Sequence, residues 1–262
     1  MKFENGIHAI TNEQYHSSEG ISRSDLVRFK KSPMHFKCKQ KIKETASLII
    51  GELVHTLVLE PHLFSERYIV NPGFDRRTKE GKLEYAEFQL ASEGKRIIEA
   101  NHYEEAVHIA ESVNNHEFKQ YLQKGYRVEN SIYFEHELTG LQCKVRPDAW
   151  LGDIVIDLKT TTDASFRSFQ SSAVNYGYFL QAGMIKRALE SLKKPLRNFI
   201  FVVVEKEAPY AIGIYKLDDE ALEYGANEFD TLMVELNKYI QKNEFPDYGI
   251  QTLSIPTWLK SE

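Results

Sequence analysis

The sequence predicts an α/β fold in which a mixed central sheet is flanked by helices, with a mainly helical N-terminal half. Two observations lead to this prediction. Segments before about residue 126 space their apolar residues as helices do, whereas later apolar runs have strand character and alternate with further helices. The order of helices, three strands, helices, two strands and a helix is typical of an α/β sandwich. We expect a single domain over residues 1–262, with a helical part at about 15–125 and a catalytic sheet core at about 126–245.

The composition indicates a folded protein outside the membrane. Apolar residues make up 42% of the chain, which is enough for a sizeable core. No apolar stretch approaches the roughly 20 residues that span a bilayer, and the first ten residues lack the layout of a signal peptide. We therefore expect a cytoplasmic location and no membrane partner. Cys38 and Cys143 have no CxxC neighbours, so they are expected to be reduced thiols and cannot supply the four thiolates of an iron–sulfur cluster.

The net charge of −5 does not by itself indicate a nucleic-acid-binding protein. For phosphate binding, however, the position of the charges matters more than their sum. Between Ser22 and Lys43 there are eight Lys or Arg residues and one Asp. This local excess predicts either a surface that contacts a phosphate backbone or a solvated helical face.

Helix-capping signals divide the N-terminal half. Ser22 and Ser24 are candidate N-caps of a first helix, and Ser32-Pro33 ends that helix and begins another. The other predicted helices are residues 46–60, which are largely apolar and end at Pro61, and the more polar segments 78–95 and 102–124.

Strand character begins near Val128. Three successive strands are predicted in VENSIYFEHEL, LQCKVRPDAWL and DIVIDLKT, with turns at Thr139-Gly140 and Gly152-Asp153. The elements that follow are helices at roughly Ala164–Val174 and Phe179–Leu192, a strand pair in NFIFVVVEK and YAIGIYKL, and a long helix from about Asp218 to Gln241.

The stretch RPDAWLGDIVIDLKTT, residues 146–161, carries the most chemical information. If Gly152-Asp153 is a two-residue hairpin turn, Asp148 faces Asp157 with Cβ atoms about 4.5–5.5 Å apart. Lys159 then lies on the same face, about 7 Å along the strand. Two carboxylates at a buried strand must be protonated, paired with cations or bound to a metal, and Mg²⁺ suits such hard oxygen ligands. The alternative is a turn aspartate beside a partly exposed Asp157–Lys159 ion pair.

Four other side chains are candidates with two interpretations each. His55 lies on the apolar helix and is either a hydrogen-bonded core residue or a metal ligand. Glu129 begins the strand before the hairpin and is either an ordinary strand-end carboxylate or a third acid beside the metal. Tyr178 and Gln181 are one helical turn apart, so they share a face that could contact a phosphate or base, or could serve packing alone.

These residues resemble a known family. The core motif is Pro147-Asp148 followed by Asp157-Leu158-Lys159, and it is similar to that of the exonuclease VIII (RecE) nuclease domain family. That family belongs to the PD-(D/E)xK superfamily and is related to the RecB nuclease domain. The similarity extends over essentially residues 15–260 and includes ISRSDLVRFKKSPMHF, GELVHTLVLEP, DRRTKEGK, ENSIYF, TGLQCKVRPD, DLKTT and TLSIPTW.

The resemblance implies a restriction-endonuclease-like fold and a 5′→3′ exodeoxyribonuclease acting on double-stranded DNA ends. It also implies a role in phage-type recombination beside a RecT-like single-strand annealing protein, and a ring-shaped homo-oligomer. By motif position, His55, Asp148, Asp157 and the Leu158 carbonyl are expected to bind Mg²⁺, with Mn²⁺ as a substitute. Lys159 is expected to position the attacking water. Glu129, Tyr178 and Gln181 occupy positions next to the active site.

On this hypothesis DNA enters over the basic Ser22–Lys43 surface. The expected backbone contacts are Arg23, Arg28, Lys30, Arg76, Arg77 and Lys79, with Arg23 or Arg28 binding a 5′ phosphate. An endonuclease or structure-specific nuclease on the same fold is one alternative, and a non-catalytic DNA-binding protein is another. The complete set of Asp148, Asp157 and Lys159 argues against the second, because drift usually removes one member.

Overall fold

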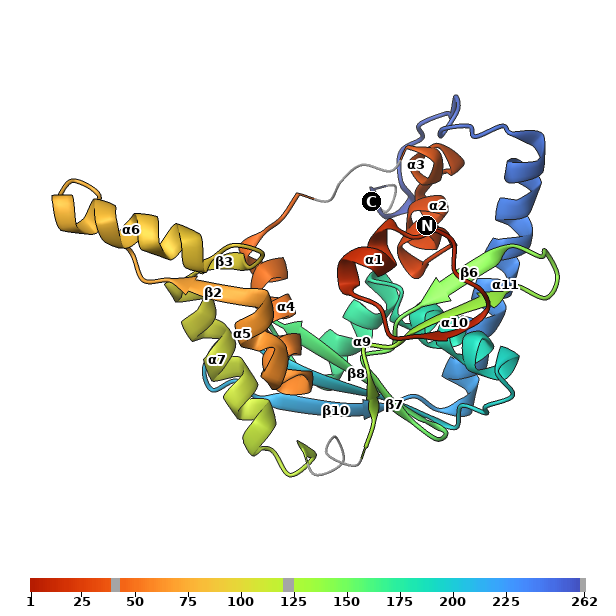
Figure 1. Cartoon of the computed structure of the whole chain (residues 1–262). Coiled ribbons are helices and arrows are strands. Elements are labelled where there is room, and N and C mark those ends of the chain that lie inside the picture. Colours follow the sequence, from red (N-terminus) through yellow and green to blue (C-terminus); the bar gives the residue numbers. More distant parts are fainter. Residues whose placement is uncertain (39–42, 120–124, 260–262) are drawn as a thin grey trace.

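The centre of the molecule is a five-stranded mixed sheet (Figure 1). The computed structural model describes residues 1–38, 43–119 and 125–259. The strand order is β10-β9-β8-β7-β4, in which β8 and β9 are parallel and the other neighbours are antiparallel. The strands are β4 (Arg127–Val128), β7 (Ala149–Leu151), β8 (Ile154–Thr161), β9 (Asn198–Glu205) and β10 (Ile212–Lys216). The predicted mixed central sheet is therefore confirmed.

A second, three-stranded antiparallel sheet has the order β1-β5-β6. Its strands are β1 (Gly6–His8), β5 (Ser131–Glu135) and β6 (Gln142–Val145). The chain passes between the two sheets twice, at Glu129-Asn130 and again at residues 146–148. The prediction of the third strand, DIVIDLKT, is therefore confirmed as β8, whereas the first two predicted strands were wrong because each is divided between the two sheets. Glu129 has a left-handed backbone with φ of 50°, and Pro147 has no amide hydrogen to continue a ladder.

Helices cover both faces of the five-stranded sheet (Figure 1). Because side chains alternate along a strand, Val155 packs on one face and Ile156 on the other. The face of Val155 is covered by α2 (Arg23–Lys31), α9 (Phe166–Asn175), α10 (Tyr178–Ser191) and α11 (Asp219–Lys242). The face of Ile156 is covered by α4 (Ala46–Leu59) and α7 (Ala100–Asn115). The sheet thus lies between two separate hydrophobic cores.

Capping explains where the predicted helices begin. Ser22, and not Ser24, caps α2, and the side chain of Asp25 completes the capping box. Ser32 ends α2 and caps α3 (Pro33–Lys37), as the Ser-Pro pair predicted. Asp218 accepts a hydrogen bond from the Ala221 amide at the start of α11. Helix α7 ends at Asn115, earlier than predicted, and residues 120–124 lie outside the described residues.

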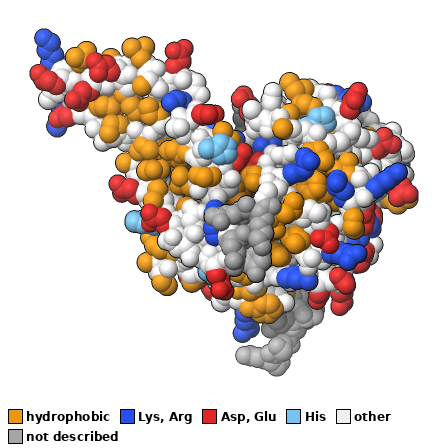
Figure 2. Space-filling view, turned by 60° about the horizontal axis from the view of Figure 1, so that its bottom comes forward, with side chains coloured by type: hydrophobic (Ala, Val, Ile, Leu, Met, Phe, Trp, Pro, Cys, Tyr) orange, Lys and Arg blue, Asp and Glu red, His pale blue; other side chains and the backbone are white. Residues whose placement is uncertain are grey.

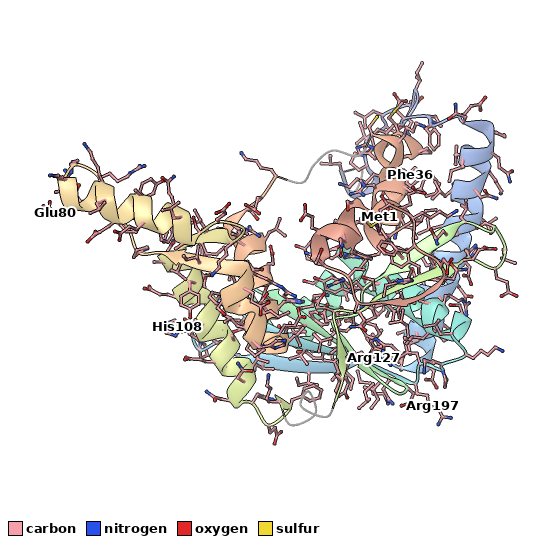
Figure 3. The ribbon with its side chains drawn as sticks, viewed as in Figure 1. Met1, Phe36, Glu80, His108, Arg127 and Arg197 are labelled. Carbon is pink, nitrogen blue, oxygen red and sulfur yellow. The ribbon has the colours of Figure 1, made fainter. Side chains whose placement is uncertain are left out.

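The segment of residues 72–95, which we call the α6 projection, extends away from the rest of the molecule (Figures 1 and 2). Its helix is α6 (Lys79–Ala91), and the labelled Glu80 lies at its outer end (Figure 3). Leu83 and Leu90 on this helix are 64% and 76% exposed. The segment joins the body through two short parallel strands that the sequence did not predict, β2 (Tyr68–Asn71) and β3 (Arg96–Glu99).

The remaining elements are short. They are α1 (Asn12–Ser17), the 3₁₀ helix η1 (Pro61–Leu63), α5 (Phe64–Arg67) and the 3₁₀ helix η2 (Thr257–Leu259). No single helix in the described part of the chain is long and apolar enough to cross a membrane. Helix α4 and the following Pro61–Arg67 segment meet the criterion only as a pair bent by 117°.

Candidate active site

The β7–β8 hairpin has the predicted register. Leu151 pairs with Ile154, Trp150 with Val155 and Ala149 with Ile156, while Gly152 adopts the left-handed conformation that the tight turn requires. The two strands differ in length, because β7 begins at Ala149 whereas β8 continues to Thr161. Beyond Ile156, β8 therefore has no β7 residue beside it. The backbone amides and carbonyls on this edge of β8 can form hydrogen bonds with side chains instead.

Leu158 occupies that uncovered edge. Its amide donates to Asp148 Oδ2 at 2.7 Å, and its carbonyl accepts from His55 Nε2 at 2.9 Å. Since a carbonyl can only accept, Nε2 of His55 carries the proton, and in the neutral ring Nδ1 presents its lone pair. One backbone position thus holds the carboxylate of the Pro-Asp motif and the imidazole of α4 together.

His55 Nδ1 faces two carboxylates. It lies 3.6 Å from Asp148 Oδ2 and 3.8 Å from Glu129 Oε1. The candidate ligand atoms of these three residues lie within 4.8 Å of one another, and we call them the His55/Glu129/Asp148 cluster. An imidazole nitrogen and two carboxylate oxygens are suitable donors for a divalent ion such as Mg²⁺ or Mn²⁺. The residues therefore fit a metal ion.

The pKa shifts in the cluster also favour a metal ion. Burial, reinforced by the nearby Asp157, raises the pKa of Asp148 to about 7. Burial opposes the charged form of His55, but Asp148 and Glu129 outweigh it and raise the pKa of His55 to about 9. The raised pKa of His55 shows that Asp148 and Glu129 favour a positive charge between them. A divalent cation would supply that charge in place of protons.

Asp157 lies outside this cluster and is bound differently. It is fully buried, its Oδ2 pairs with the Lys159 ammonium, and its Oδ1 accepts from Gln181 Nε2 at 2.6 Å. Although burial opposes the charge, Asp157 and then Asp148 raise the pKa of Lys159. The Lys159 Nζ also lies 5.0 Å from the centroid of the Tyr178 ring. The structure thus groups four predicted site residues in a second set beside the cluster.

Both sets adjoin one cavity of about 1240 Å³. Its wall includes His55, Glu129, Leu158, Lys159 and Tyr178. The cavity continues past hydroxyl-bearing side chains at the end of β8 and the start of α4, namely Thr160, Thr161, Thr162, Thr45 and Ser47. The cavity is thus larger than a typical small-molecule pocket and combines these polar groups with apolar wall.

Of the three predicted DNA contacts on α2, Arg23 lies beside the site residue Tyr178, and none of the three lines the cavity. Arg23 donates from Nη2 to the Tyr176 carbonyl at 2.5 Å, and its Cζ lies 5.8 Å from the Tyr178 ring centroid. Arg28 pairs with Asp25 at 2.8 Å, and Lys30 forms an ion pair with Glu228. Part of the basic stretch, residues 39–42, lies outside the described residues.

The other predicted DNA contacts, Arg76, Arg77 and Lys79, belong to the α6 projection, and none of them lines the cavity. Arg77 pairs with Asp75 at 2.8 Å, and the Arg76 Cζ lies 4.8 Å from the Tyr85 ring centroid. The structure does not bring these three residues to the His55/Glu129/Asp148 cluster.

Two contributions to the site were missed from the sequence. Helix α1 and its N-cap contribute Thr11, Asn12, Glu13 and His16 to the cavity wall. A signal was present, because Thr11 and Gln14 form a capping box with the usual spacing. The second is Arg146, whose Nε donates to Glu129 Oε2 at 2.6 Å. An Arg directly before the Pro-Asp pair was visible, but its partner depends on the fold.

Comparisons with known proteins identify the family and the fold. The profile of the PDDEXK-like domain of unknown function (DUF3799) matches residues 22–253. No curated protein matches the sequence. A crystal structure of a candidate exonuclease from Eubacterium rectale has a TM-score of 0.63 at 15% identity, covering 95% of this chain and 96% of that one. An alkaline exonuclease from Laribacter hongkongensis has a TM-score of 0.27 at 15% identity, covering 63% and 87%.

The matched profile spans most of the chain, including every residue of both sets described above. The matched range includes Pro147-Asp148 and Asp157-Leu158-Lys159, which lie on either side of the β7–β8 hairpin. The similarity to the Eubacterium rectale structure independently supports the same fold. The chain therefore belongs to the PDDEXK-like family.

Proposed function

We propose that this protein is a divalent-metal-dependent exonuclease that degrades double-stranded DNA from its ends in the 5′→3′ direction. The observation that carries the proposal is the His55/Glu129/Asp148 cluster, with the Asp157–Lys159 pair beside it, at a cavity whose wall includes His55, Glu129 and Lys159. Membership of the PDDEXK-like family supports a nuclease, and the Eubacterium rectale protein of the same fold is itself described as an exonuclease candidate. The direction and the duplex substrate come from the resemblance to the RecE family.

The cluster residues and the Leu158 carbonyl would hold Mg²⁺, or Mn²⁺ in its place. When bound, such an ion polarises a phosphate and lowers the pKa of a coordinated water. His55 presents Nδ1 because Nε2 is bound to Leu158, and Asp148 is fixed by the Leu158 amide. These two hydrogen bonds orient both side chains before substrate arrives, which reduces the reorganisation that catalysis requires.

Lys159 is proposed to orient the attacking water and to offset negative charge on the phosphate. Asp157 holds its ammonium, and Gln181 in turn holds Asp157. Because Asp157 and Asp148 raise its pKa, Lys159 is a cation at neutral pH, so it acts through charge and orientation rather than as a base. The ring of Tyr178 adjoins the ammonium and lines the cavity.

Arg23 is proposed as the residue that binds a 5′ phosphate. Its Nε is buried and makes no hydrogen bond with any residue that the structure describes. Its guanidinium lies beside Tyr178 and forms no ion pair with any residue that the structure describes, whereas Arg28, whose Nε is likewise buried without a hydrogen bond, forms an ion pair with Asp25. Comparing 5′-phosphorylated with 5′-hydroxyl duplex tests this role. Arg23→Ala should remove a preference for the phosphorylated end, and an unchanged preference would exclude Arg23.

The principal test uses linear duplex labelled at the 5′ or the 3′ end, with Mg²⁺, Mn²⁺ or EDTA. We expect metal-dependent release of nucleotides from the 5′-labelled end and no digestion of covalently closed circles. Lys159→Ala should abolish the release while DNA binding persists. Cleavage of closed circles would instead support an endonuclease, and end binding without turnover in either metal would support a non-catalytic protein.

A role in phage-type recombination with a RecT-like annealing protein, and a ring-shaped homo-oligomer, are further parts of the proposal that rest on the RecE resemblance alone. Light scattering coupled to size-exclusion chromatography measures the oligomeric state directly. A monomeric mass at micromolar concentration would count against a ring. Loading of an annealing protein onto the strand left by digestion tests the partnership.

A further inference from the structure

We propose that Arg146 is a positioning residue that holds Glu129 in the His55/Glu129/Asp148 cluster and thereby sets the affinity of the cluster for a divalent metal. The inference rests on the proposed function only in taking the cluster as a metal site, and it does not require nuclease activity. Three features of the molecule support it: the bonding of Arg146, the backbone of Glu129 and the connection to the N-terminal segment.

Arg146 is almost fully buried, and its Nε and Nη1 atoms bind three partners. Its side chain is 9% exposed. The Nε donates to Glu129 Oε2 at 2.6 Å, and Nη1 donates to Ser131 Oγ at 2.8 Å and to the Ile10 carbonyl at 3.0 Å. A planar guanidinium can direct donors at several fixed partners at once, whereas a lysine ammonium cannot reproduce that geometry. Arg146 therefore fixes the direction of the Glu129 carboxylate.

Glu129 needs such a partner because its backbone is unfavourable for a residue with a Cβ. Its φ of 50° lies in the left-handed region, at the point where the chain passes from β4 to β5. Its amide donates to the Asp148 carbonyl at 3.0 Å, so the two points at which the chain changes sheet are bonded to each other. Arg146 lies where the chain returns to the five-stranded sheet, and it binds the side chain of Glu129, which lies where the chain leaves that sheet.

The two oxygens of the Glu129 carboxylate therefore have different partners. Oε2 is taken by Arg146, and Oε1 faces His55 Nδ1 at 3.8 Å. Arg146 thus leaves one oxygen directed into the cluster and prevents the carboxylate from turning away. Outer partners that orient metal ligands typically change metal affinity by about 10- to 100-fold when they are removed.

Arg146 also connects the cluster to a part of the chain that precedes the family match. The match begins at residue 22, whereas Ile10, which Arg146 binds, directly precedes the α1 residues that line the cavity. The Arg146 side chain therefore binds both the N-terminal segment and the Glu129 carboxylate. Displacement of this segment should weaken metal binding as well as open the cavity wall.

The test measures binding of Mn²⁺ alone, without DNA, from the loss of the free-ion electron paramagnetic resonance signal. Arg146→Lys should weaken Mn²⁺ binding by about 10- to 100-fold. Lys144→Met is the matched control, because Lys144 is also buried and binds the N-terminal segment at the Tyr15 and Ser18 carbonyls. The control should change Mn²⁺ affinity by less than a few-fold. An unchanged affinity in Arg146→Lys, or an equal loss in both variants, would overturn the proposal.

A double-mutant cycle separates positioning from general damage to the fold. In a Glu129→Gln background, Arg146→Lys should cause no further loss of Mn²⁺ affinity, because its effect acts through the Glu129 carboxylate. Independent, additive losses would refute the positioning role, and this comparison holds even if Arg146→Lys is less stable. If the wild-type protein binds Mn²⁺ and passes these tests but leaves DNA intact, only the proposed function fails. If it degrades DNA and Arg146→Lys binds Mn²⁺ normally, only this inference fails.

Discussion

Asp148 accepts a hydrogen bond from the backbone amide of Leu158 at 2.7 Å, so the acid of the Pro-Asp motif is bonded directly to the strand that carries the DxK motif. The bond exists because β7 begins at Ala149 and leaves this edge of β8 uncovered. It places the Asp148 carboxylate in a buried position close enough to Asp157 for the two charges to disfavour each other. The charge on Asp148 should therefore affect the stability of the protein as well as its activity.

Asp148→Asn is expected to stabilise the metal-free protein while abolishing nuclease activity. The pKa of Asp148 is raised from 3.8 to about 7 by burial and then by Asp157, so ionisation costs folding free energy as the pH rises from about 4 to about 7. At pH 8 the wild type bears this cost in full, and an asparagine oxygen can still accept from the Leu158 amide. The midpoint of thermal unfolding in EDTA at pH 8 should rise by about 2–4 °C, equivalent to about 1 kcal/mol.

The control for this measurement is Asp247→Asn. Asp247 is exposed and accepts from the Gly249 amide, which an asparagine can also do. Its melting temperature should match that of the wild type. A lower melting temperature for Asp148→Asn in EDTA would show that the ionised carboxylate stabilises the fold, and would contradict the destabilising effect expected from its burial beside Asp157.

Gln181→Ala is expected to impair both stability and activity. It leaves Asp157 Oδ1, which is fully buried, without the donor that lies at 2.6 Å. Loss of a hydrogen bond to a buried charged group costs about 1.5–3 kcal/mol. The nuclease rate should fall by about 10- to 100-fold, since Asp157 would no longer hold Lys159 in one orientation. Urea unfolding and single-turnover digestion measure the two effects.

Gln170→Ala provides the comparison, because Gln170 is exposed on α9. It should retain both the free energy of unfolding and the nuclease rate of the wild type. Equal behaviour of the two glutamine variants would remove Gln181 from the support of Asp157.

Gly183→Ala is expected to force α10 and α11 apart. A Cβ at Gly183 would lie 2.0 Å from the carbonyl carbon of Gly225, and one at Gly225 would lie 1.9 Å from the Phe179 carbonyl oxygen. Such overlap with backbone cannot be relieved by rotating a side chain. The free energy of unfolding should therefore fall by at least about 1–3 kcal/mol.

Gly51→Ala is expected to have the opposite effect and to stabilise the protein. Gly51 lies within α4, and a Cβ there would meet only Thr160 Oγ1 within 4 Å, at an ordinary 3.6 Å. Alanine should stabilise this helix by about 0.5–1 kcal/mol. Denaturant titrations of both variants test the pair, and a stable Gly183→Ala protein would contradict the close packing of α10 on α11.

The two cysteines should differ sharply toward a thiol reagent. Cys38 is exposed, whereas Cys143 is fully buried and its pKa is raised by burial. The native protein should react at one thiol, and the second should react only after unfolding in guanidinium. A Cys38→Ser variant should then show no reaction in the native state. Two fast-reacting thiols in the native wild type would contradict the packing around β6.

Local chemistry determined much of this protein from the sequence alone. Gly152-Asp153 specified the hairpin turn and with it the register of β7 on β8, because turn type and side-chain alternation act over neighbouring residues. Ser22, Ser32 and Asp218 determined where helices begin in the same way. The mixed sheet and the proximity of Asp148 to the DxK strand followed from these short-range rules.

The tertiary structure alone decided which groups meet around that hairpin. His55 bonds to Leu158 across 103 residues of sequence, and the direction of the Glu129 carboxylate depends on a change of sheet that no periodicity reveals. Asp157 is bound by Gln181 rather than joining the cluster, because alternation along β8 turns it toward α10. These contacts arise from packing between distant segments, and local patterns in a sequence carry no information on which distant segments will pack together.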